Sequence, residues 1–131
     1  MKRPGPKVRH EPPAPIKDFE RERASRTLGE LPMVLLVAKA VIHEEHFAPA
    51  LALSFEHVNR SRAQAQCIDH AVYRDLDDRR RLVFLGQWFD RDALLAHLRL
   101  PESIVFTLAL EGLAAEKPHM ATFDVTQDSA A

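Results

Sequence analysis

The first regular pattern in this chain is an apolar run at residues 33–42, MVLLVAKAVI, which only Lys39 interrupts. Its length and its β-branched residues predict a strand rather than a helix. A strand with one face in water alternates between apolar and polar residues. Because this run is apolar at successive positions, we expect both of its faces to be covered.

A helical repeat follows at residues 45–62. Pro49 fits this helix only near the first turn, where the missing backbone N–H would have no intrahelical partner. Apolar and small residues recur at helical spacing and predict one stripe that faces the core. The residues of this stripe are Phe47, Leu51, Ser54, Phe55 and Val58.

Two further strands are predicted at residues 67–75 and 81–89. The polar turn that joins them, residues 76–80, is short enough to predict an antiparallel hairpin. Asp90 then stands where the N-cap residue of a short helix at residues 91–98 is expected.

The second helical region is broken in two. Pro101 can occupy the first position of a further helix, which is expected to run to residue 117 because Pro118 cannot continue it. A last strand is predicted at residues 120–125. The resulting order, β-α-β-β-α-β, is that of the ferredoxin-like split βαβ arrangement.

This order predicts an α+β fold in which a four-stranded antiparallel sheet carries helices on one face. The other face of the sheet would be bare. Since the run at residues 33–42 is apolar on both faces, we expect a second copy of the chain to cover the bare face, which predicts a homodimer.

The chain divides into two unequal parts. Residues 1–31 hold five prolines before Lys17, eight Lys or Arg against five Asp or Glu, and few large apolar residues. This composition predicts a disordered extension. The alternatives are a basic tail that touches nucleic acid, or a native start at Met33. Residues 32–126 form the predicted domain, and residues 127–131 form a polar tail.

Composition and charge narrow the classes of function. The 131 residues suit one domain, and a formal net charge of −1 provides no field that would attract nucleic acid or an anionic membrane. No apolar run reaches transmembrane length, and the N-terminus has no signal-peptide core, so a cytoplasmic protein is expected. The single cysteine, Cys67, excludes an intramolecular disulfide and favours a reducing compartment.

Residues after the third predicted strand carry a family resemblance. They are Trp88, Asp90, Ala93, Leu94, His97 and Leu98, preceded by YRD at residues 73–75. With the element order of residues 33–125, this pattern resembles the antibiotic biosynthesis monooxygenase (ABM) family. The resemblance implies a small dimeric α+β barrel. It implies no single activity, because the family includes quinol and polyketide monooxygenases, haem-degrading enzymes and members without known activity.

His97 is the candidate catalytic residue. In the family pattern its helix position is expected to face a cavity between the helices and the sheet. An imidazole titrates near neutrality and can accept a proton from a phenol or an enol. The alternative is a histidine that caps the helix or only packs.

Five other residues are candidate substrate contacts, and each of them also has an ordinary structural interpretation, such as core packing or, for Tyr73, a strand tyrosine that spans core and solvent. Trp88 could stack on a flat aromatic substrate, and Tyr73 could donate a hydrogen bond to a ligand oxygen. Phe84 and Phe106 would be apolar walls. Ser54 would present a small polar group on the inner stripe, or would simply bond a carbonyl one turn back.

No metal site and no cofactor site is predicted. The sequence HEEH at residues 43–46 lacks the HExxH spacing of zinc proteases. His70 has no further ligands at a suitable spacing. The chain has four glycines and no Gly-rich phosphate loop, so it lacks nucleotide and flavin motifs.

The leading hypothesis is a cofactor-independent monooxygenase that oxidises a small aromatic, quinol or enol substrate with O₂. Two alternatives stay open. One is a non-catalytic, dimeric ligand-binding or stress-associated module. The other is a non-redox enzyme of the same fold, such as an isomerase or a dehydratase.

Overall fold

The structure of this protein is a computed structural model that describes residues 33–128. The expected extension at residues 1–31 lies outside the described residues, as does the end of the expected tail, residues 129–131. The elements in chain order are β1 (Met33–Val41), the short 3-10 helix η1 (Glu44–His46), α2 (Phe47–Arg62), β2 (Cys67–Arg74), β3 (Arg81–Trp88), α3 (Arg91–Arg99), α4 (Pro101–Leu113) and β4 (His119–Val125).

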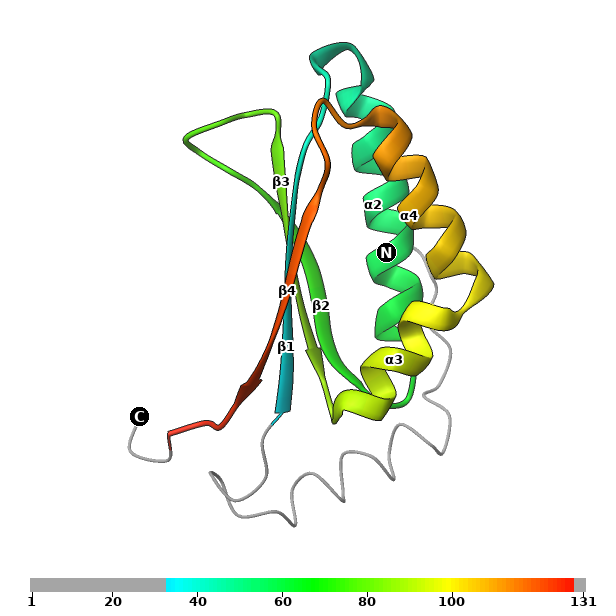
Figure 1. The fold of residues 1–131 in the computed structure, drawn as a ribbon, viewed down its shortest axis with the longest axis vertical. Helices are drawn as coiled ribbons and strands as arrows, with labels where there is room; N and C mark the ends of the chain where they lie inside the picture. The colour runs from blue at the N-terminus through cyan, green and yellow to red at the C-terminus, as the bar shows by residue number, and fades with distance from the viewer. Residues whose placement is uncertain (1–32, 129–131) are drawn as a thin grey trace.

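The four strands form one antiparallel sheet in the order β2-β3-β1-β4. Figure 1 shows the helices α2, α3 and α4 on one side of this sheet, with α2 and α4 packed together. No described element covers the opposite face. The α+β, ferredoxin-like fold expected from the element order is therefore confirmed.

The register of the central strands decides which side chains face the helices. Val34 pairs with Trp88, and Leu36 pairs with Gly86. These four residues are buried, whereas their neighbours along β1 and β3 are half-buried. Alternate residues of each strand therefore point into the helix layer, and the others line the open face.

A β-bulge in β2 changes the alternation at its start. Cys67 lies opposite Trp88, but the register shifts between Cys67 and Asp69, so that His70 lies opposite Gly86. Two residues on one side of a regular strand are separated by an even number of positions. The bulge therefore places Cys67 and His70, three positions apart, on the same buried side of the sheet.

The buried stripe of α2 differs from the expected one. Phe55 was assigned to the core face, but its side chain is 52% exposed. The inner face instead carries small and polar residues, because a helix lies closest to its neighbours where its side chains are short. The buried residues of α2 are Ala50, Ser54, His57, Val58 and Ser61.

Helix α4 is shorter than expected and ends at Leu113 rather than at residue 117. Ala114 adopts an extended conformation and forms an isolated antiparallel bridge with Ile42. The backbone N–H of Ala115 donates to the carbonyl of Val41 at 2.7 Å. Pairing with the chain that leaves β1 thus satisfies the backbone groups that a longer helix would have used, and the helix ends before Pro118 takes effect.

Two apolar clusters make up the core. One surrounds Leu82, Phe84 and Phe106, and the other surrounds Leu36 and Trp88. Between them lie buried histidines, which are described below.

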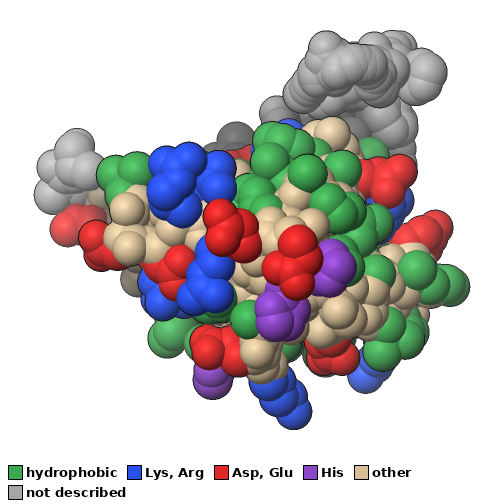
Figure 2. Space-filling view, turned by 90° about the horizontal axis from the view of Figure 1, so that it is seen from above, with side chains coloured by type: hydrophobic (Ala, Val, Ile, Leu, Met, Phe, Trp, Pro, Cys, Tyr) green, Lys and Arg blue, Asp and Glu red, His purple; other side chains and the backbone are tan. Residues whose placement is uncertain are grey.

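The surface shows no concentration of one charge on the face seen in Figure 2, where acidic and basic side chains are interspersed. In the described residues, no single helix is long and apolar enough to cross a membrane. Only α3 and α4 taken together reach that length and composition, and they are bent by 71° at the break between them.

Candidate functional site

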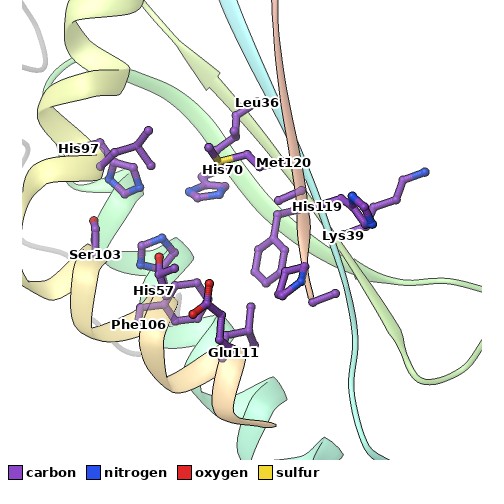
Figure 3. A pocket seen from close by; sticks show the side chains of 17 residues that line it. Leu36, Lys39, His57, His70, His97, Ser103, Phe106, Glu111, His119 and Met120 are labelled. Atoms are coloured by element: carbon purple, nitrogen blue, oxygen red, sulfur yellow. The ribbon is translucent and has the colours of Figure 1, made fainter. Parts of the chain in front are cut away.

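Three buried histidines from three different elements converge under the helix layer. His57 comes from α2, His70 from β2 and His97 from α3 (Figure 3). Their relative exposures are 5%, 1% and 2%. The ring centroids form a nearly equilateral triangle, with separations of 5.1 Å for His57–His97, 5.5 Å for His57–His70 and 5.8 Å for His70–His97. We call these residues the histidine cluster.

His97 is positioned by the capped start of α3 and by Trp88. The side chain of Asp90 accepts a hydrogen bond from the backbone N–H of Ala93 at 2.8 Å, as the sequence predicts. The Trp88 ring lies 4.5 Å from the His97 ring, tilted by 30°. The indole thus forms one wall against which the imidazole is held.

His57 is held from both sides. Its ring stacks on Phe106, with centroids 4.0 Å apart and an interplanar angle of 5°. The guanidinium of Arg60 donates to His57 Nδ1 at 3.3 Å. Because arginine is only a donor, we assign the proton of the neutral His57 ring to Nε2.

Several ring nitrogens in the histidine cluster and in the adjacent Trp88 lack hydrogen-bond partners among the described residues. They are both nitrogens of His70, Nδ1 of His97 and the indole Nε1 of Trp88. An unsatisfied buried polar group costs about 1–3 kcal/mol, so four such atoms in one place require an explanation. Edge contacts between the aromatic rings offset only part of this cost.

Gly86 makes the close approach of Trp88 and His70 possible. A Cβ atom at Gly86 would lie 2.9 Å from Trp88 Nε1 and 3.4 Å from His70 Cδ2. Any larger residue at this point of β3 would therefore push into the histidine cluster.

A cavity of about 240 Å³ adjoins the cluster. Apolar residues dominate its wall, with the three histidines and Ser103 at the end that Figure 3 shows. A second cavity of about 210 Å³ shares His57, His97 and Ser103 with the first and adds the polar residues Arg60, Gln64 and Glu102. The apolar wall of the first cavity comprises Leu36, Ala38, Ala40, Phe84, Leu98, Phe106, Leu110, Pro118 and Met120.

Burial makes the cluster weakly basic. Desolvation is the main cause that lowers the pKa of His57 to about 3, with repulsion from His70, His97 and Arg60 adding to it. Desolvation likewise lowers the pKa of His70 to about 3 and that of His97 to about 4. All three rings are therefore neutral at pH 7. The lone pair of His57 accepts from Arg60, whereas His70 and His97 each carry a buried nitrogen without a partner among the described residues.

The structure brings together some of the residues predicted from sequence. His97, Phe84 and Phe106 line the larger cavity, and Trp88 packs directly behind His97. The expectation of a histidine beside an apolar cavity thus agrees with the geometry.

Two of the predicted substrate contacts lie elsewhere. Tyr73 is 54% exposed and faces the open side of the sheet, because its register partner Val83 lies on that side. Ser54 is fully buried, and its hydroxyl donates to the carbonyl of Ala50 at 2.7 Å. Neither residue lines either of the two cavities described above.

His57 and His70 were not predicted as site residues. A signal for His57 is present in α2, where Ala50, Ser54, His57 and Ser61 follow helical spacing and form a stripe of small and polar residues. The position of His70 depends on the β-bulge, for which the sequence carries no comparable signal.

Comparisons with known proteins agree with the geometry. The family model described as antibiotic biosynthesis monooxygenase matches residues 33–106, more than half of the chain. No curated protein matches the chain significantly.

Solved structures show the same fold. A conserved protein from Methanosarcina mazei Go1 is 20% identical with a TM-score of 0.68, and the match covers 71% of this chain and 92% of that protein. A protein described as an antibiotic biosynthesis monooxygenase is 22% identical with a TM-score of 0.67, covering 70% and 97%. Rv0793 from Mycobacterium tuberculosis is 18% identical with a TM-score of 0.69, covering 74% and 98%. These structures share the fold, and the family model, which matches more than half of the chain, shows that the chain belongs to the antibiotic biosynthesis monooxygenase family.

Proposed function

We propose that this protein oxidises a small aromatic, quinol or enol substrate with O₂, and that His97 accepts the substrate proton. The observation that carries the proposal is a neutral, buried imidazole at the wall of an apolar cavity. Membership of the ABM family supports it.

The cavity is suitable for a substrate with one or two rings. A cavity of about 150 Å³ is enough to hold benzene, and the larger cavity here has about 240 Å³. Phe84 and Phe106 provide aromatic walls for a flat ring. The polar lining residues form two groups, with the histidine cluster and Ser103 in one, and Lys39, Glu111 and His119 away from it in the other. A hydroxyl or enol group that binds beside the histidine cluster would place its proton within reach of His97, the group that accepts it in this proposal.

His97 is a weak base in the free protein, but substrate binding changes its environment. Its pKa near 4 reflects the cost of placing a positive charge among apolar groups. A substrate anion that forms beside it would pair with the imidazolium and compensate this cost. Proton transfer and anion formation therefore stabilise each other, and the apolar walls keep water away from the anion.

The reaction balances without an external reductant. His97 takes a proton from the acidic carbon or hydroxyl group, and the carbanion form of the substrate donates electrons to O₂ as a C–O bond forms. The peroxide receives the proton back from His97. The O–O bond then breaks with loss of water, and a carbonyl oxygen remains on the carbon. All four electrons that reduce O₂ come from the substrate.

Oxygen uptake by the purified protein tests this function. We expect consumption of O₂ with some members of a panel of hydroquinones and anthrones. His97→Ala should lower kcat by about 10²- to 10⁴-fold, the usual contribution of a positioned acid or base. The matched control is His43→Ala, which removes an exposed histidine from the same chain. Absence of O₂ uptake across the panel, or an unchanged kcat in His97→Ala, would contradict the proposal.

A further inference from the structure

The histidine cluster has the composition of a metal site as well as that of a proton acceptor. Each of His57, His70 and His97 offers one ring nitrogen, and these three atoms lie within 4.8 Å of one another. We propose that the three imidazoles bind one divalent first-row transition-metal ion. This inference goes beyond the proposed function, which requires no metal.

The spacing of the rings fits three imidazoles around one ion. Zinc–nitrogen bonds of about 2.05 Å in tetrahedral geometry would place three imidazole centroids roughly 5.2 Å apart. The observed separations are 5.1, 5.5 and 5.8 Å. The ring positions thus need to change by only a few tenths of an ångström, and the remaining adjustment is a rotation that turns the nitrogens inward.

The unpartnered nitrogens are the second observation. Both ring nitrogens of His70 and Nδ1 of His97 are buried without a hydrogen-bond partner among the described residues. His70 is 1% exposed and His97 is 2% exposed, so neither ring can satisfy these atoms with bulk water. A metal ion would use lone pairs that are otherwise buried at a cost.

The donor set selects the class of ion. Three imidazole nitrogens suit Zn²⁺, Cu²⁺, Ni²⁺, Co²⁺ and Fe²⁺, whereas Mg²⁺ and Ca²⁺ require oxygen ligands. Three protein ligands also leave a fourth position open, as in catalytic zinc sites. Because the cavity adjoins the cluster, a water molecule or another oxygen ligand could reach the fourth position of the ion from it.

Arg60 opposes metal binding. Its guanidinium occupies Nδ1 of His57 at 3.3 Å and brings a positive charge to the site. The Arg60 side chain is 37% exposed, so it can swing towards solvent when an ion binds. We therefore expect Arg60→Met to tighten metal binding, whereas loss of a ligand would weaken it.

Isothermal titration of the untagged, chelator-treated full chain with ZnCl₂ tests the site. We expect one Zn²⁺ per chain. His57→Ala, His70→Ala and His97→Ala should each weaken binding by more than the roughly 10- to 100-fold that loss of an outer-shell partner costs. The matched control is the double variant His43→Ala/His46→Ala, which removes one exposed and one half-buried histidine, both outside the cluster. Binding that survives in the cluster variants, or that disappears in the control, would overturn the proposal.

A second measurement uses the unmodified protein, so it tests the metal site even if the histidine variants fail to fold. Long-range ¹H–¹⁵N NMR spectra report each histidine ring, and saturating Zn²⁺ should shift one nitrogen in each of three buried rings. The rings of His43, His46 and His119, which lie outside the cluster, should stay unchanged. If Zn²⁺ shifts only rings outside the cluster, or none, the proposal fails.

The failure of this proposal can be distinguished from that of the proposed function. Zn²⁺ is not redox-active, and it would occupy the lone pair with which His97 accepts a proton, so it should inhibit oxygen uptake. Zinc binding without any oxygen uptake in the metal-free protein would support the metal site and contradict the proposed function. Oxygen uptake that depends on His97, in a protein that binds no zinc, would support the proposed function and contradict the metal site.

Discussion

His57 lies face to face on Phe106, while His70 approaches both His57 and His97 edge-on. These rings fill space that apolar residues fill elsewhere in the core, and they also carry nitrogens with no partner among the described residues. At the scale of single residues, these unsatisfied nitrogens lower the stability of the folded protein at the cavity wall. Unsatisfied buried groups of this kind are typical of places where chemistry or binding occurs.

The three histidines predict how stability depends on pH. In the unfolded chain they titrate near 6.5, whereas in the folded protein their pKa values lie at about 3, 3 and 4. Below pH 6.5 the unfolded state therefore binds more protons than the folded state. The folded state should be most favoured above pH 6.5 and should lose stability as the pH falls from 6.5 towards 4, by up to about 1.4 kcal/mol per pH unit for each ring.

Urea unfolding between pH 7.5 and pH 4.5 in metal-free buffer measures this effect. His97→Leu should make the free energy of unfolding less dependent on pH, because it removes one of the three groups. The exposed control His43→Ala should leave that dependence unchanged. A wild-type stability that does not vary over this range would contradict the prediction.

Two glycines provide a matched pair of substitutions. Gly86→Ala places a Cβ 2.9 Å from Trp88 Nε1, so it should destabilise the protein by about 1–3 kcal/mol and alter the tryptophan fluorescence. Gly112→Ala in α4 meets nothing within 4 Å and should be neutral or stabilising by up to about 1 kcal/mol. Equal effects of the two substitutions on thermal unfolding would show that the space at Gly86 is not restricted.

At the scale of elements, the sequence predicts the start of α3 correctly but not the end of α4. The cap of α3 is local, since Asp90 needs only the backbone N–H of Ala93, and it was predicted correctly. The end of α4 depends on pairing of Ala114 and Ala115 with the chain that leaves β1, more than 70 residues earlier in the sequence. Such a contact leaves no trace in the local pattern, and the predicted helix was four residues too long.

The cap of α3 can be tested directly. Asp90→Ala should destabilise the protein by about 1 kcal/mol, because the backbone N–H of Ala93 loses its acceptor. Asp90→Asn should retain most of the stability, since the asparagine oxygen can accept the same bond. Thermal unfolding measures both, and the prediction fails if the two variants are equally destabilised.

At the scale of the whole molecule, the open face of the sheet is an apolar surface that no described element covers. Leu35, Val37, Val83 and Leu85 lie on it at neighbouring positions, and Phe123 of β4 is 48% exposed there. We propose that a second copy of the chain covers this face, as expected from the sequence. A large uncovered apolar face is unusual for a monomer.

Analytical ultracentrifugation tests the dimer. We expect the wild-type chain to sediment as a dimer and Leu85→Glu to sediment as a monomer, because the substitution places a charge at the centre of the open face. Phe55→Lys on the outer side of α2 is the control and should remain dimeric. A monomeric wild type, or loss of the dimer in the control, would contradict this arrangement.

The sequence by itself determined the order of the elements and the class of fold, whereas the expectation that His97 lies near a cavity came from the family resemblance. The element order and the fold class follow from local periodicity, caps and turns, which act over a few residues. Only the tertiary structure decided that His57 and His70 join His97. The bulge in β2 turns His70 inward, and α2 brings its stripe of small residues against the sheet, so residues 40 positions apart in the chain share one buried site.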